Sequence, residues 1–177
     1  MNLPNKLTIG RMIAVPFFIA AYILGYYPVA LVIFIGASIT DYFDGKIARS
    51  QNLVTNFGKI MDPLADKILV YSALCLFIES EIISAWMLIL ILAREFIVAG
   101  MRTVAASEGT VLAAGMSGKI KTVLQMVAVI LFLTALCFKD SVPAIMTAGN
   151  VVFWASLVMT VYSGAEYVLK NRSVFSM

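Results

Sequence analysis

Four aspartates occur as two spaced pairs within largely apolar sequence. Asp41 and Asp44 are three residues apart, and Asp62 and Asp66 are four apart. Spacings of three and four place residues on one face of a helix, so each pair is expected to share a face. Carboxylate oxygens suit Mg²⁺, Mn²⁺ or Ca²⁺. Four of them could hold two such ions around a phosphate, an arrangement that supports in-line displacement.

The two pairs are expected at a shared depth. Asp41 lies thirteen residues after Pro28, and Asp66 lies thirteen residues before Glu79. At 1.5 Å per residue, both lie about 20 Å from the same end of two antiparallel helices. The other member of each pair lies roughly one turn further along. Carboxylates this close repel one another in a low dielectric, so we expect cations to neutralise them.

Small residues accompany the acids. Gly45 and Ala48 follow Asp41 by four and seven residues, and Gly58 precedes the third aspartate by four. Small side chains let a ligand approach the backbone, and the adjacent Arg49 could reach a phosphate. Small residues are also common where membrane helices cross, which is the alternative interpretation.

The elements that must position these residues are membrane helices. The chain has 177 residues, of which 62% are hydrophobic and 13% charged, and its mean hydropathy is +0.96. A bilayer span needs about 20 apolar residues. We predict a single all-α transmembrane domain over residues 1–177, in which Pro63 either kinks the third helix or marks its start. The six predicted spans are Met12–Tyr27, Val29–Ala48, Phe57–Ile78, Ile82–Ala105, Thr122–Phe138 and Ala144–Leu169.

The basic residues predict the orientation. Most lie near one set of predicted helix ends, whereas Lys139 lies at the other. Basic residues favour the cytoplasmic side, so both termini and the aspartates are expected to face the cytoplasm. The same rule explains the net charge of +3 without a nucleic-acid partner. The chain has no histidine, which excludes serine–histidine catalysis and histidine-ligated zinc sites.

The aspartate segment resembles the signature of the CDP-alcohol phosphatidyltransferase family. Written out, it is Asp41-x2-Asp44-Gly45-x2-Ala48-Arg49-x8-Gly58-x3-Asp62-x3-Asp66. The resemblance extends over nearly the whole chain through the six-span layout. It implies a multi-pass cell-membrane protein that forms a homodimer.

Residue roles follow from the same resemblance. It implies that the four aspartates hold two divalent cations, Mg²⁺ or Mn²⁺, and that Asp66 also serves as general base. The donor would be CDP-diacylglycerol. Its CDP part would be bound by Gly45, Ala48, Arg49 and Gly58. Three N-terminal residues resemble the nucleotide-contacting stretch of the family, although a helix cap with orienting charges explains them equally well. They are Asn5, Thr8 and Arg11.

A second group of basic residues bears on the acceptor. Arg94 lies thirteen residues after Glu81, so its expected depth matches that of the aspartates. A cation this deep suits an anionic acceptor, whereas an ion pair with Glu95 is the structural alternative. Further cations that could bind the acceptor phosphate, or simply orient the helices, are Arg102, Lys119 and Lys121.

The segments around Arg94 and Lys119 are similar to those of family members that use glycerol 3-phosphate, giving phosphatidylglycerol phosphate and CMP. Other acceptors, namely serine, inositol phosphate or phosphatidylglycerol, remain alternatives. A divalent-cation transporter would also need acids inside the membrane. A non-catalytic lipid-binding protein of the same fold is a third possibility.

Overall fold

The computed structural model describes residues 3–50, 56–107, 109–110, 112–113, 115–138 and 142–172, without the side chains at 3–6, 41–50, 56–60, 62, 63, 66 and 142. The described residues form six α-helices and no strands. The helices are α1 (Leu3–Ile23), α2 (Tyr27–Ser50), α3 (Asn56–Glu79), α4 (Ala85–Ser107), α5 (Met116–Cys137) and α6 (Val142–Lys170). The prediction of six helices is therefore confirmed.

Two helices begin well before the start that the apolar pattern predicted. The first begins at Leu3 rather than Met12, and α5 begins at Met116 rather than Thr122. Hydrophobicity locates only the apolar part of a helix, whereas backbone hydrogen bonds continue through polar residues. Pro63 lies well inside α3, so the alternative that it marks the start of that helix is wrong.

Left-handed residues end three of the helices. Gly25 (φ 77°) follows α1, Gly109 (φ 76°) follows α4, and Glu81 (φ 59°) follows α3. After α1, the N–H of Tyr26 donates to the carbonyl oxygen of Ala21 at 2.8 Å, which satisfies one of the last carbonyls of the helix. Glycine adopts this backbone conformation freely, whereas a residue with a side chain, such as Glu81, adopts it at a cost of about 1 kcal/mol.

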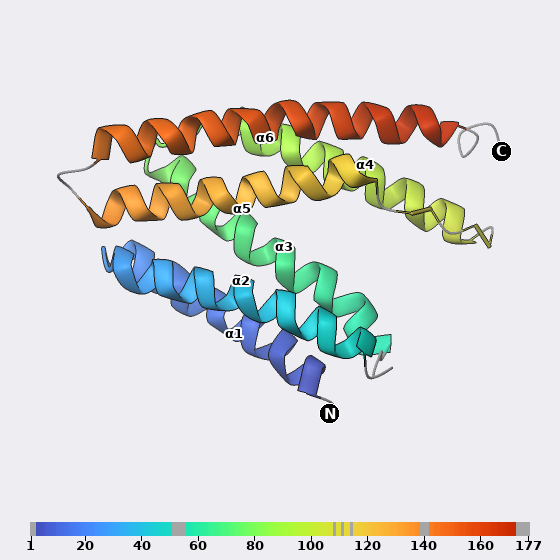
Figure 1. The fold of residues 1–177 in the computed structure, drawn as a ribbon, viewed down its shortest axis with the longest axis horizontal. Helices are drawn as coiled ribbons and strands as arrows, with labels where there is room; N and C mark the ends of the chain where they lie inside the picture. Colours follow the sequence, from blue (N-terminus) through green and yellow to red (C-terminus); the bar gives the residue numbers. More distant parts are fainter. Residues whose placement is uncertain are drawn as a thin grey trace.

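The helices run up and down, so that the two ends of the bundle differ (Figure 1). The start of α1, the end of α6 and the facing ends of α2 and α3 lie toward one end, which we call the terminal end. The turns after α1 and α3 lie toward the opposite end. Helix α1 packs on α2 and α3, and α6 packs on α5 and α4.

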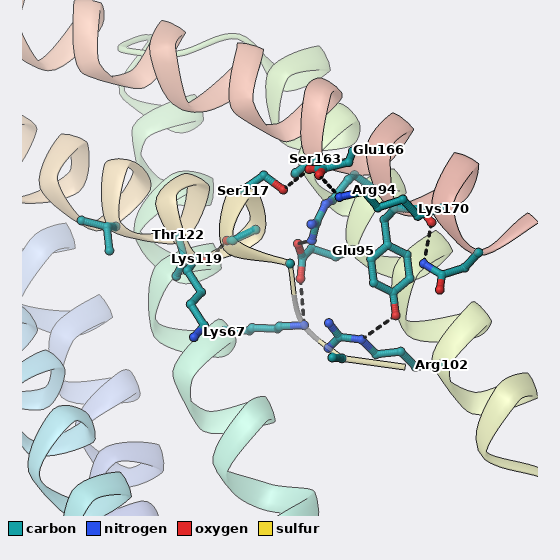
Figure 2. A pocket seen from close by; sticks show the side chains of 16 residues that line it. Lys67, Arg94, Glu95, Arg102, Ser117, Lys119, Thr122, Ser163, Glu166 and Lys170 are labelled. Atoms are coloured by element: carbon teal, nitrogen blue, oxygen red, sulfur yellow. Dashed lines mark hydrogen bonds and ion pairs between the residues drawn. The ribbon is translucent and has the colours of Figure 1, made fainter. Parts of the chain in front are cut away.

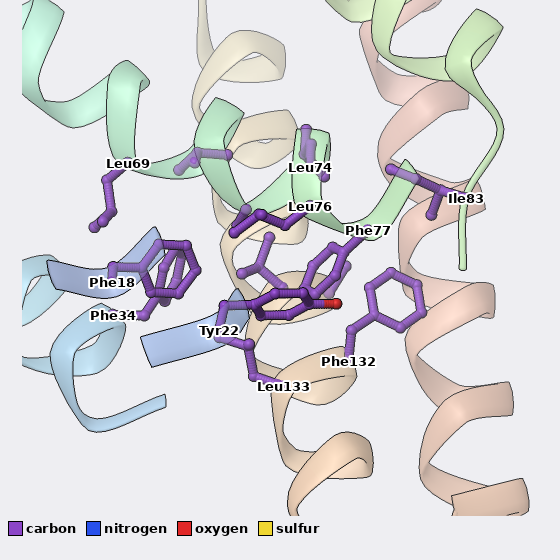
Figure 3. Packing of buried hydrophobic residues seen from close by; sticks show 14 of the residues in the cluster. Phe18, Tyr22, Phe34, Leu69, Leu74, Leu76, Phe77, Ile83, Phe132 and Leu133 are labelled. Carbon is purple, nitrogen blue, oxygen red and sulfur yellow. The ribbon is translucent and has the colours of Figure 1, made fainter. Parts of the chain in front are cut away.

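Aromatic rings pack together within the hydrophobic core (Figure 3). They lie near the ends of α1 and α3, which point away from the terminal end (Figure 1). Phe77 on α3 stacks edge-on against Tyr22 on α1, with 5.9 Å between ring centroids, and against Phe132 on α5, at 5.3 Å. Phe132 continues to Phe153 on α6 at 6.0 Å. Such pairs add about 0.5–1.5 kcal/mol each beyond the burial of their surface. This aromatic column fixes the four helices relative to one another.

Part of the described chain could cross a bilayer. Helix α5 and residues Pro143–Lys170 of α6 are long and apolar enough, and shorter apolar stretches cover Leu7–Ile23 and Tyr27–Thr40. Large apolar side chains also remain exposed on several helices, which is expected where lipid replaces water. These features are consistent with a membrane protein.

Candidate active site

A charged cavity of about 530 Å³ opens between α4, α5 and α6, with Lys67 reaching it from α3 (Figure 2). Its charged lining residues are Lys67, Arg94, Glu95, Arg102, Lys119, Glu166 and Lys170. Five cations thus accompany two carboxylates. The cavity has the charge and the volume to take a small anion.

Glu95 is the centre of the ion pairs on one side of the cavity. Its Oε2 lies 2.8 Å from Nζ of Lys67, and its Oε1 lies 2.7 Å from Nη1 of Arg94. Oε1 also accepts a hydrogen bond from Nζ of Lys121. One carboxylate therefore joins cations from α3, α4 and α5.

Among the side chains that the structure describes, this cluster holds more positive than negative charge. Three cations share Glu95, and the side chain of Lys121 is only 3% exposed. Buried charges are costly unless they are paired, because a low-dielectric surrounding replaces water poorly. A small anion in the cavity would offset the excess positive charge.

A second set of contacts lies on α6. Glu166 accepts hydrogen bonds from Oγ of Ser117 and from Nζ of Lys170, both at 2.6 Å. Arg102 donates from Nε to the hydroxyl oxygen of Tyr167 at 3.1 Å, and its guanidinium carbon lies 5.4 Å from the centre of the same ring. These contacts tie α6 to the start of α5 and to α4.

The structure brings most of the predicted acceptor residues together. Arg94, Arg102 and Lys119 all line the cavity. Lys121 does not line it and instead supports it from behind through Glu95. The ion pair between Arg94 and Glu95, considered as an alternative, is present. This ion pair involves Nη1 of Arg94, and the side chain of Arg94 also lines the cavity.

The N-terminal candidates occupy a different place. Thr8 and Arg11 are buried on α1. Arg11 also lines a groove of about 370 Å³ between α1 and α2, which extends to Thr40, the residue before Asp41. The groove thus leads toward the aspartate segment. Their role in binding the nucleotide stays a prediction.

The four aspartates are described only through their backbone. Asp41 and Asp44 lie within α2, and Asp62 and Asp66 lie within α3. Uninterrupted helix at both pairs supports the expectation that each pair shares a face. Their side chains fall outside the described part of the chain, and so do those of Asn5, Gly45, Ala48, Arg49 and Gly58. Their predicted roles stay predictions.

Several cavity residues were not singled out from the sequence. Lys67 directly follows Asp66, and the preference of basic residues for the cytoplasmic side is enough to explain both Lys67 and Lys170. Glu166 lies four residues before Lys170, a spacing that predicts an ion pair on one helix face. Nothing in the sequence indicated that Ser117 and Tyr167 would reach the same cavity, because this depends on how α5 and α6 pack.

Comparisons with known proteins agree with the motif. The family model described as CDP-alcohol phosphatidyltransferase matches residues 1–162. The chain is 43% identical to the CDP-diacylglycerol–glycerol-3-phosphate 3-phosphatidyltransferase of Bacillus subtilis (strain 168), covering 96% of this chain and 95% of the relative. It is 35% identical to the Escherichia coli (strain K12) protein of the same name, covering 97% and 96%.

A third relative has a different printed name. The probable phosphatidylglycerophosphate synthase of Mycobacterium tuberculosis (strain ATCC 25618 / H37Rv) is 38% identical, over 96% of this chain and 81% of the relative. The family model and these relatives cover both the aspartate segment and the helices α4 and α5 that carry most of the cavity cations. The chain belongs to the CDP-alcohol phosphatidyltransferase family.

Proposed function

We propose that this chain transfers the phosphatidyl group of CDP-diacylglycerol to a hydroxyl of glycerol 3-phosphate, giving phosphatidylglycerol phosphate and CMP in phospholipid biosynthesis. The observation that carries the proposal is the cavity in which Arg94, Arg102 and Lys119 converge. Arginine and lysine bind phosphate through charge-assisted hydrogen bonds, so the cavity suits an acceptor that is itself a phosphate ester. The names of the relatives in B. subtilis and E. coli support the same acceptor.

The four aspartates suit hard divalent ions as ligands. Asp41, Asp44, Asp62 and Asp66 supply only carboxylate oxygens, the ligands that Mg²⁺ and Mn²⁺ prefer. In the proposal they hold two such ions. When bound, the ions would neutralise charge on the phosphates and on the departing CMP.

The protein residues have separate tasks. Asp66 takes the proton of the acceptor hydroxyl as general base. The acceptor oxygen then forms a bond to the phosphatidyl phosphorus, while the bond from that phosphorus to the oxygen of CMP breaks. Arg49, with Gly45 and Ala48, binds the CDP part of the donor. Arg49 also stabilises the negative charge that develops on the departing CMP. Arg94, Arg102 and Lys119 hold the phosphate of glycerol 3-phosphate, which limits the orientations of its hydroxyl groups.

The membrane arrangement is part of the proposal. Six spans would place both termini and the reaction on the cytoplasmic side. The end of α4, the start of α5 and the end of α6, which carry most of the cavity residues, lie toward the terminal end (Figure 1). Most basic residues of the sequence lie near the same set of helix ends. The acyl chains of the donor would stay in the bilayer while its nucleotide reaches the aspartates.

The resemblance to the family also suggests a homodimer. Light scattering measures the molar mass of the detergent-solubilised protein, and a mass of one protomer would contradict the homodimer.

The proposed function predicts which substrates release CMP. Purified protein in detergent, with Mg²⁺ or Mn²⁺ and CDP-diacylglycerol, should release CMP when glycerol 3-phosphate is added. Serine, inositol phosphate and phosphatidylglycerol should release far less, and a chelator should stop the reaction. CMP release with one of these other alcohols alone would move the chain to another acceptor. Divalent-cation flux in vesicles without CMP release would favour a transporter.

Replacing Arg94 with alanine should weaken acceptor binding selectively. A charge-assisted hydrogen bond is worth about 1.5–3 kcal/mol, so the KM for glycerol 3-phosphate should rise about 10- to 100-fold. The KM for CDP-diacylglycerol should change little. Arg172→Ala is the matched control, because Arg172 is exposed and does not line the cavity. Equal rises in both KM values would count against this assignment of the acceptor site.

A further inference from the structure

Arg94 is enclosed by two helices besides its own. A methyl group built on Gly118 of α5 would lie 3.1 Å from Nη2 of Arg94. One built on Gly164 of α6 would lie 3.0 Å from its Cγ. Both distances are shorter than ordinary van der Waals contact, so a methyl group at either position would require the side chain of Arg94 to shift by a few tenths of an ångström.

The remaining groups of this side chain are also constrained. Nη1 is held at 2.7 Å by Glu95, which is itself held by Lys67 and Lys121. Nε is buried and has no hydrogen-bond partner among the described residues. The aliphatic part is thus fixed against α6 and the guanidinium is fixed between α5 and Glu95. The orientation of the guanidinium is set before any ligand arrives.

We propose that Gly118 and Gly164 are positioning residues that form a slot for Arg94 and thereby set the affinity for the acceptor phosphate. The inference rests on the proposed function and deepens it. An arginine that is already oriented loses little side-chain entropy when it binds an anion, so a preformed slot raises affinity without adding a contact. The slot also explains why helices α5 and α6 carry glycine where they pass this side chain, although glycine weakens a helix.

Two other glycines provide controls for the close approach to Arg94. A methyl group on Gly100, which lies on the same helix as Arg94, would meet nothing within 4 Å. One on Gly149 would lie 2.9 Å from the ring of Phe132 in the aromatic column. The chain therefore supplies two control positions. Gly100→Ala adds a methyl group in open space, and Gly149→Ala crowds the core away from the cavity.

The test compares four alanine variants of the full chain. Gly164→Ala should raise the KM for glycerol 3-phosphate about tenfold, because Cγ lies close to the backbone and moves little, so the guanidinium is displaced. Gly118→Ala should raise it about threefold, because the end of a flexible side chain can yield. The KM for CDP-diacylglycerol should stay unchanged in both. Alanine favours helix over glycine, so both variants are expected to fold.

The controls separate positioning from packing. Gly149→Ala should lower the unfolding temperature without changing either KM, and Gly100→Ala should change neither property. A rise in both KM values in the slot variants, or the same acceptor KM as the wild type, would overturn the inference. The proposed function fails differently, since the wild-type protein itself would then not release CMP with glycerol 3-phosphate. Thermal shift with glycerol 3-phosphate alone provides a readout without turnover, and the slot variants should need more of it for the same shift.

Discussion

Replacing Asp66 with asparagine is expected to reduce the rate of CMP release about 10²- to 10⁴-fold, which is the usual contribution of a general base. Asparagine has nearly the same shape but cannot accept the proton of the acceptor hydroxyl. Three aspartates and an amide oxygen would remain for the ions, so the affinity for Mn²⁺ should fall much less than the rate. CMP release and a Mn²⁺ titration on the same preparation measure the two effects.

Glu79→Gln is the matched control for this substitution. Glu79 ends the same helix thirteen residues away, near the opposite end of the bundle. Its replacement should leave the rate of CMP release unchanged. If Asp66→Asn loses Mn²⁺ binding and activity in parallel, Asp66 acts as a ligand rather than as the base. If it retains full activity, another group accepts the proton.

Replacing Glu95 with glutamine is expected to have the largest effect on stability. The change leaves Lys67, Arg94 and Lys121 without their shared carboxylate. Removing one partner of a buried ion pair typically costs about 3–5 kcal/mol, because the remaining charge stays poorly solvated. The unfolding temperature in detergent should therefore fall markedly. Inorganic phosphate should restore more stability to this variant than to the wild-type protein, since an anion in the cavity can replace the missing charge.

Glu166→Gln serves as the comparison, because it removes a carboxylate from the same cavity. Its basic partner Lys170 is 71% exposed, and exposed ion pairs contribute only about 0–1 kcal/mol. A small loss of stability is therefore expected. If the two variants lose equal stability, the cations around Glu95 are better solvated than their burial indicates.

The sequence predicted the architecture because long apolar runs have one stable form in a bilayer. Six helices followed from those runs. The predicted start of the first span, Met12, lies later than the start of α1. The helix begins at Leu3 and includes the polar residues that precede its apolar part. Hydropathy reports the solvent around a helix, not where its hydrogen bonds begin.

The site was predictable only in part, for a similar reason. Arg94 could be found because its depth depends on position along one helix. That Lys67, Arg94 and Lys121 would share one carboxylate depends on rotations of three helices about their axes, which spacing within a single helix does not determine. The slot at Gly118 and Gly164 depends in addition on the distance between helices.

The aromatic column and the charged cavity occupy different regions of the bundle, and this separation limits what a ligand can disturb. An anion that enters the cavity can replace a carboxylate or a water molecule as the partner of a lysine or arginine, because these cations bind any of the three. The rings of Phe77 and Phe132 carry no polar group that an anion could bind. Binding and release of small anions can therefore rearrange the side chains of the cavity. The aromatic column meanwhile keeps the helices in their relative positions.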